Sequence, residues 1–196
     1  MVRSRRMTRS FRDAPIEPEL IDRLVDLGSR SPSAGKTQGW HVVVLEGAAT
    51  ARLWDITLPS PRRESFRWQG LLRAPVIMLP LADPDAYVAR YAEVDKQASG
   101  LGRGTEAWPV PYWTIDASMA MMTMLLAAQD AGLGALLFGI FRGEDELRAS
   151  LGIPANLELL GAIALGWPDT AAADDTGLSA SRPRRAPGAI IHRNGW

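Results

Sequence analysis

The chain of 196 residues contains no cysteine and only two histidines, His41 and His192. The lack of cysteine excludes a disulfide scaffold, a thiolate zinc site, an iron–sulfur cluster and a cysteine nucleophile. Two histidines cannot form a three-histidine metal site, and we expect no metal. No Gly-x-Ser-x-Gly motif is present. If the chain is an enzyme, a bound cofactor is therefore expected to supply its chemistry.

Long apolar segments are also missing. No run approaches the roughly 20 residues that cross a bilayer, and no apolar stretch of the signal-peptide type follows the N-terminal arginines. We therefore expect a cytoplasmic protein without a membrane partner.

Lysine is scarce: Lys36 and Lys96 are the only two, and the other 20 basic residues are arginine. Residues 1–12 contain five arginines and residues 182–196 contain four, and neither stretch contains an acid. Arginine binds phosphate or carboxylate with two parallel hydrogen bonds. The basic ends indicate an anionic ligand if the fold brings them together, and two solvated tails if it does not. The net charge of zero argues against a nucleic-acid partner.

Hydrophobic periodicity and turn residues predict one α/β domain over residues 1–196. The expected helices cover residues 18–30, 50–56, 87–96, 112–131 and 144–151. The expected strands cover residues 41–45, 75–81, 135–141 and 157–167, and residues 189–192 could add an edge strand. The helix at 112–131 is apolar on almost every face, which is typical of a core or of a subunit interface. Residues 170–181 are expected to form a linker.

Two glycine-containing segments superficially match phosphate-binding motifs. Gly35-Lys36-Thr37 would need a further glycine at position 30, where Arg30 stands, so it is not a P-loop. The glycines at positions 100, 102 and 104 do not follow a predicted strand, and a mobile, lid-like insertion over residues 99–113 is the better interpretation.

Five segments, taken in order, resemble the flavin-dependent nitroreductase family. They are RRMTRSF (Arg5–Phe11), SPSAGKTQGW (Ser31–Trp40), LLAAQDAGLGALLFGIF (Leu125–Phe141), LGIPANLELLGAIALGWPD (Leu151–Asp169) and RRAPGAIIHRNGW (Arg184–Trp196). The resemblance implies a homodimer of α+β subunits, each with a central mixed, mostly antiparallel sheet flanked by helices. It also implies that FMN binds at the subunit interface.

The resemblance assigns cofactor-binding roles to matching positions. Those near the phosphate are Arg5 and Arg6 and, in the basic tail 182–196, Arg184 and Arg185; Arg9 matches a basic position near N1 and the C2 carbonyl. The loop residues are Pro32, Ser33, Ala34, Gly35, Lys36 and Gln38, and the segment along the flavin is Leu137, Phe138 and Gly139. Met7 is also an expected cofactor-binding position. Departures from the family pattern are Met7, Lys36, Gly39 and Ile140, which stand where a hydroxyl residue, asparagine, proline and glycine are usual.

The substrate side is expected to include Lys36, Trp108, Tyr112 and Trp113. Lys36 either points into the pocket or points outward, and the aromatic residues either cover the flavin or fill the core beneath it. The implied function is hydride transfer from NAD(P)H, a transient donor, to an electron-poor acceptor such as a nitroaromatic, quinone or enone, by a ping-pong mechanism. A non-catalytic protein that sequesters FMN is the main alternative, and a flavin-free phosphate-binding module is a third.

Overall fold

The computed structural model describes residues 2–171 and 177–196, and its centre is an antiparallel sheet. The strand order is β1-β2-β5-β3, and the short β4 pairs with β2. The strands are β1 Trp40–Glu46, β2 Val76–Ala82, β3 Gly134–Phe138, β4 Glu158–Leu159 and β5 Ala162–Gly166. The α+β class is confirmed. Among the described residues every strand pairing is antiparallel, where a mixed, mostly antiparallel sheet was expected.

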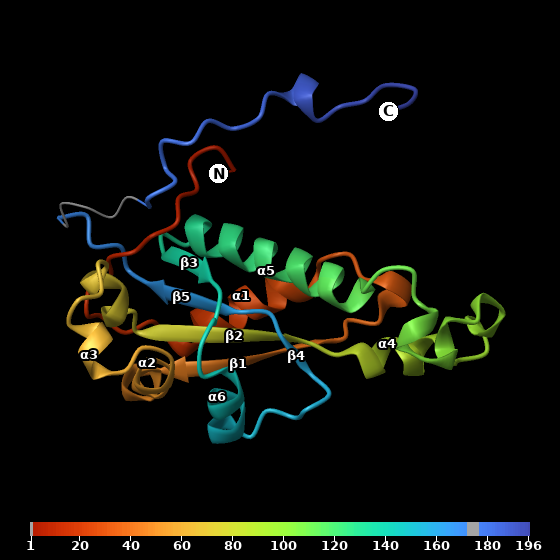
Figure 1. Cartoon of the computed structure of the whole chain (residues 1–196), viewed down its shortest axis with the longest axis horizontal. Coiled ribbons are helices and arrows are strands. Elements are labelled where there is room, and N and C mark those ends of the chain that lie inside the picture. The colour runs from red at the N-terminus through yellow and green to blue at the C-terminus, as the bar shows by residue number, and fades with distance from the viewer. Residues whose placement is uncertain (1, 172–176) are drawn as a thin grey trace.

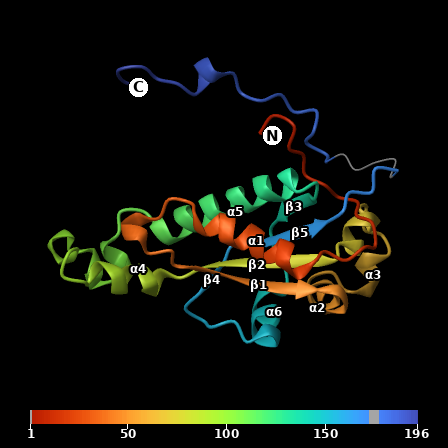
Figure 2. The same ribbon diagram turned by 180° about the vertical axis from the view of Figure 1, so that it is seen from behind.

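Helices cover both faces of the sheet, so the central strands are apolar on both sides. Val76 and Met78 of β2 pack in a core with α1 (Pro18–Ser29) and α5 (Tyr112–Asp130). Ile77 and Leu79 point to the opposite core, against α2 (Ala51–Thr57) and α6 (Glu144–Leu151). This follows from the alternation of side chains along a strand. Figures 1 and 2 show α1 and α5 on one side of the sheet and α2 and α6 on the other.

Helices α1 and α5 pack closely because a glycine stands at their contact. A Cβ added at Gly28 would lie 2.9 Å from Cγ of Met124. Pro18 begins α1, a position where the missing N–H of proline costs no helical hydrogen bond. The contact holds α5 against the sheet along one side and leaves a row of its side chains on the surface.

The predicted helix at 87–96 is α4 (Pro84–Tyr91), which begins earlier because the side chain of Asp83 accepts a hydrogen bond from Ala86 N. The helix also ends at Tyr91, not at residue 96 as predicted. The residues after it lead into the expected insertion 99–113. They form short 3₁₀ turns at Gln97–Ser99, Leu101–Arg103 and Thr105–Ala107. The arginine-rich stretch before β2 contains a further short helix, α3 (Ser60–Arg63), and a 3₁₀ turn at Gln69–Arg73.

Three strand predictions need correction. The strand predicted at 157–167 is two strands, because Gly161 adopts a φ of +123° that no regular strand allows. The strand predicted at 135–141 ends at Phe138, and the possible edge strand at 189–192 does not form. Part of the predicted linker at 170–181 lies outside the described residues.

The first residues and the C-terminal tail lie on the α5 side of the molecule (Figure 1). Thr8 N donates to Ala135 O at 3.0 Å, which places the N-terminal segment beside β3. The tail stands off the body, and all its residues from Leu178 onward are exposed. No helix in the described part of the chain is both long and apolar enough to cross a membrane.

Candidate functional site

Apart from the tail arginines, the expected cofactor residues form two separate groups in the structure. Residues 5–9 and residues 137–139 belong to neighbouring segments, since Thr8 N donates to Ala135 O and Arg9 lines one cavity with residues 137–139. We call these residues the N-terminal cluster. The expected loop residues 32–38, called the SAG loop here, lie near the other end of α5, where Ala34 contacts Asp116. Asp116 and the C-terminal residue of α5 are separated by 14 residues, or about 21 Å of helix. Within one protomer the two groups therefore do not meet.

A cavity of about 380 Å³ adjoins the N-terminal cluster. Its lining includes Arg9, the β3 residues 136–138, Gly139, and aromatic side chains of α2 and of the segment before β2. Trp54 of α2 stacks on Phe138, with ring centroids 5.7 Å apart and planes 7° from parallel. The cavity therefore has flat apolar walls and two arginines, Arg9 and Arg142, in its lining, a combination suited to a planar ligand with a polar rim.

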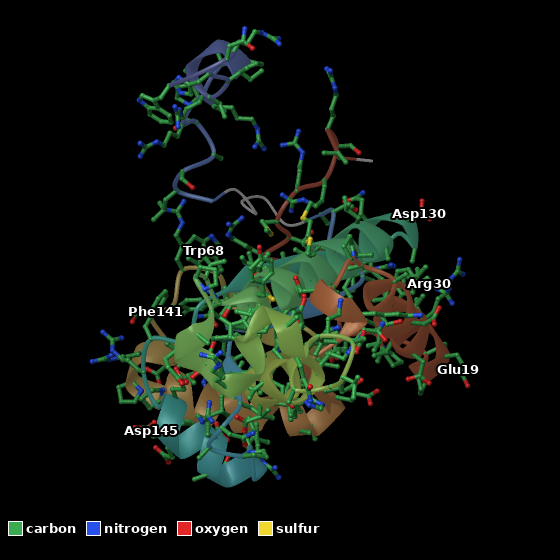
Figure 3. The ribbon with its side chains drawn as sticks, turned by 90° about the vertical axis from the view of Figure 1, so that its right-hand side faces the viewer. Glu19, Arg30, Trp68, Asp130, Phe141 and Asp145 are labelled. Carbon is green, nitrogen blue, oxygen red and sulfur yellow. The ribbon has the colours of Figure 1, made fainter. Side chains whose placement is uncertain are left out.

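Trp54 and Trp68 were not among the expected site residues. The indole Nε1 of each is buried and has no hydrogen-bond partner, which is unusual for a buried polar atom. The guanidinium of Arg9 lies over the Trp68 ring, 5.4 Å from its centroid. In Figure 3, Trp68 and Phe141 lie on the same side of the molecule, although they come from segments before β2 and after β3. The sequence signal that could have found them is the pair of tryptophans that flanks an arginine-rich stretch.

The SAG loop has an unusual backbone that other elements hold in place. Gly35, Lys36 and Gln38 have φ values of 62°, 54° and 53°. A Cβ at Gly35 would lie 2.9 Å from the Tyr91 ring. Arg90 Nε donates to Gly35 O at 3.0 Å. Such conformations cost energy for residues other than glycine, so they persist only where the surroundings impose them.

The side chains of the SAG loop are exposed or only partly buried. Lys36 is exposed and lines a polar hollow of about 310 Å³ with Arg30 and Ser33. The amide of Gln38 donates to Ser29 O at 2.7 Å, at the end of α1. Ser33 Oγ accepts a hydrogen bond from Gln38 N at 2.8 Å. The loop therefore leaves backbone groups and the side chain of Lys36 accessible to a ligand or to a second protomer.

The expected aromatic residues of the substrate side divide between core and surface. Trp108 and Trp113 are buried, and their indole N–H groups donate to Leu101 O and Glu158 Oε1, each at 3.0 Å. Tyr112 is 38% exposed at the start of α5, beside Trp108. Of the three, only Tyr112 presents a large apolar surface to the outside of this protomer.

The tail arginines lie apart from both groups. Arg184 and Arg185 are exposed on the segment that stands off the body. The base of the tail passes close to the N-terminal cluster, since a Cβ at Gly177 would lie 2.7 Å from Arg9 Nη2. The basic termini thus lie on the same side of the molecule, the side that carries the surface of α5.

Comparisons with known proteins identify similar proteins over most or all of the chain. Residues 2–167 match the model of the nitroreductase family. A candidate NADH dehydrogenase/NAD(P)H nitroreductase of Archaeoglobus fulgidus is 28% identical over 100% of this chain and 97% of its own length. An NAD(P)H-type FMN reductase of Bacillus subtilis is 26% identical over 96% of this chain and 70% of its own length. A candidate nitroreductase of Desulfovibrio desulfuricans, solved in complex with FMN, matches the fold with a TM-score of 0.68. It is 23% identical and covers 100% of this chain and 95% of that one.

Proposed function

The chain belongs to the nitroreductase family, and on this premise we propose that it is an FMN-dependent oxidoreductase. The proposed reaction takes a hydride from NADH or NADPH and delivers it to an electron-poor acceptor such as a nitroaromatic, quinone or enone. The relatives named as an NAD(P)H nitroreductase and an NAD(P)H-type FMN reductase support the class of reaction and the donor. The observation that carries the proposal is the family match together with the flat-walled cavity beside Arg9.

The residues present fit FMN. The cavity walls are planar and apolar, as an isoalloxazine ring requires, and Arg9 stands at the edge. Two indole N–H groups near this cavity lack a partner, and the pyrimidine side of a flavin is rich in acceptor atoms. The SAG loop has a glycine where a Cβ would meet Tyr91, so its backbone can stay close to neighbouring groups.

The family resemblance assigns the binding roles, and the chemistry of the side chains supports them. The guanidinium groups of Arg5, Arg6, Arg184 and Arg185 would hold the phosphate, which carries about −1.5 to −2 charges at neutral pH. Arg9 would face the N1 and C2 carbonyl edge, where a cation favours negative charge on the ring. Residues 137–139 would line the ring with backbone groups. When bound, the flavin supplies the hydride chemistry, accepting from the nicotinamide and donating to the acceptor.

We expect the nicotinamide donor and the electron acceptor to bind one after the other at the same face of the flavin ring. Neither the N-terminal cluster nor the SAG loop contains an acid or a histidine, so solvent would supply the protons that the acceptor needs. Lys36, exposed on the SAG loop, would favour acceptors that carry a negative charge, and Tyr112 would contribute an apolar wall.

Initial-rate kinetics test this account. Double-reciprocal plots against NADPH, at several fixed concentrations of a quinone acceptor, should give parallel lines, the pattern of a ping-pong reaction. Lines that intersect would show that donor and acceptor bind together, and would contradict the use of one face in turn.

We also propose that the functional unit is a homodimer formed across α5. Ile115 and Met122 are 42% and 40% exposed, and with Tyr112, Met119 and Leu126 they form an apolar row at the spacing of a helix–helix seam. A two-fold axis across the middle of this row would bring the SAG loop of one protomer to the N-terminal cluster of the other. Each of two identical sites would then use residues of both chains.

Met122→Glu should abolish the dimer and, with it, FMN binding. A carboxylate placed in an apolar interface loses its hydration without gaining a partner. Light scattering should report half the wild-type mass. After incubation with FMN and removal of the unbound FMN, the protein should be colourless. Val94→Glu is the control, because Val94 is 88% exposed and lies outside α5. A Met122→Glu protein that stays dimeric would remove α5 from the interface.

A further inference from the structure

Asp116 is the only acidic or basic side chain that is nine-tenths buried among the described residues. It lies on α5 and is 3% exposed. Its Oδ2 accepts two hydrogen bonds, one from Ala34 N at 2.7 Å and one from Tyr87 OH at 2.7 Å. Both donors are neutral groups, so no arginine or lysine accounts for the burial of this oxygen. A buried carboxylate held in this way points to a role that an apolar residue could not fill.

Tyr87 of α4 is fully buried and fixes the carboxylate from the other side. Burial, the largest cause, raises the pKa of Tyr87 above its ordinary value, and the hydrogen bond with Asp116 raises it further. The hydroxyl therefore stays protonated and donates to Asp116. The Tyr87 ring packs edge-on against Trp108 and Trp113, with centroids 5.7 and 6.3 Å apart. Asp116 thus joins three elements, namely α5, α4 and the SAG loop.

The bond from Ala34 N reaches the SAG loop next to its strained part. Ala34 directly precedes Gly35 and Lys36, both with positive φ. On the far side of Ala34, Ser33 Oγ lies 3.4 Å from Tyr87 OH. Ser33 and Ala34 are therefore both held by the same buried hydrogen-bonded pair, Tyr87 and Asp116. Removing the acceptor would leave the Ala34 N–H unpaired and release a conformation that only its surroundings maintain.

We propose that Asp116 is a positioning residue, which holds the backbone of residues 33–36 in the shape that receives FMN at the dimer interface. Tyr87 is its partner, since it orients the carboxylate and links it to the aromatic cluster of Trp108 and Trp113. This role rests on the proposed function. Asp116 itself touches neither cofactor nor substrate, and acts through the Ala34 backbone.

Matched variants of α5 test the role. Asp116→Ala should weaken FMN binding at least tenfold at 25 °C, measured by fluorescence titration of the apoprotein. Asp116→Asn should stay within threefold of wild type, because its amide oxygen can take the place of Oδ2 and accept from both Ala34 N and Tyr87 OH. Asp130→Ala is the control: Asp130 is exposed at the opposite end of the same helix, as Figure 3 shows. It should bind FMN as the wild type does.

Tyr87→Phe keeps the ring and removes only the hydroxyl, so it serves if Asp116→Ala does not fold. It should weaken FMN binding three- to tenfold. In the apoprotein, the Ala34 amide should exchange with deuterium faster in Tyr87→Phe and Asp116→Ala than in Asp130→Ala. A purely structural role would lower the melting temperature and leave the FMN dissociation constant of the folded protein unchanged. That result would overturn the proposal, and so would an Asp116→Asn variant as weak as Asp116→Ala.

The failure of the proposed function has a different signature. If the wild-type protein binds no FMN, the cofactor assignment is wrong. The Ala34 exchange rates, which need no cofactor, then decide whether Asp116 anchors the SAG loop.

Discussion

Replacing Arg184 and Arg185 together by alanine is expected to weaken FMN binding about 100-fold or more. Each guanidinium would make charge-assisted hydrogen bonds to the phosphate, and a hydrogen bond to a charged group contributes about 1.5–3 kcal/mol. Loss of two such contacts amounts to at least about 3 kcal/mol, which is roughly a factor of 100 in the dissociation constant. The measurement is a fluorescence titration of apoprotein with FMN.

Two controls make this result specific. Arg182→Ala and Arg193→Ala remove charge from the same exposed tail and should have small effects that added salt reduces further. Riboflavin, which lacks the phosphate, should bind the double variant as it binds the wild type. An unchanged affinity for FMN in the double variant would refute the phosphate role and leave the tail arginines as solvated charges.

Each FMN site is expected to combine the SAG loop of one protomer with the N-terminal cluster of its partner. Gly35→Val should abolish FMN binding in a homodimer, because Gly35 has a φ of +62° and its Cβ would lie 2.9 Å from Tyr91. The double change Arg5→Ala/Arg6→Ala should also abolish FMN binding, because it removes phosphate contacts of the N-terminal cluster. In a mixed dimer of these two variants, one site combines both wild-type parts. We therefore expect one FMN per mixed dimer, measured on dimers purified with two different affinity tags.

The reciprocal mixture is the matched control, since it contains the same substitutions. A protomer that carries all three changes, paired with a wild-type protomer, should bind no FMN, because each site then contains one altered part. If each site were built within a single chain, the two mixtures would give the opposite results. One FMN in the reciprocal mixture and none in the first would therefore contradict the shared site.

Local patterns in the sequence predicted most of the fold. Helix α1, β1, β2 and the long α5 lie close to where periodicity placed them, because each has a clear apolar face or a continuous apolar run. The break between β4 and β5 was missed, since Leu157–Trp167 reads as one apolar strand and only the φ of Gly161 divides it. The turns at residues 97–107 were missed because their glycine-rich composition is typical of loops.

The site was harder to predict, because its parts meet only in three dimensions. The resemblance identified the SAG loop and residues 137–139 without indicating that α5 separates them. In the sequence, Asp116 is only one polar residue within a mostly apolar helix, and nothing around it indicates a role at the site. Its contact with Ala34, 82 positions earlier, depends on the packing of α5 against the loop. Trp54 and Trp68 were not expected at the site. Their one local signal is that they flank an arginine-rich stretch, and this does not distinguish a cavity-lining tryptophan from a core residue.

The central claim is that this chain binds FMN in a form that a nicotinamide donor can reduce. Its most direct test is the visible spectrum of the FMN-loaded protein under anaerobic conditions, recorded before and after addition of NADPH and, in a parallel sample, NADH. We predict that the flavin bands bleach rapidly with at least one donor and return when a quinone or nitroaromatic is added. Flavin bands that persist with both donors would contradict this account and favour a protein that sequesters FMN.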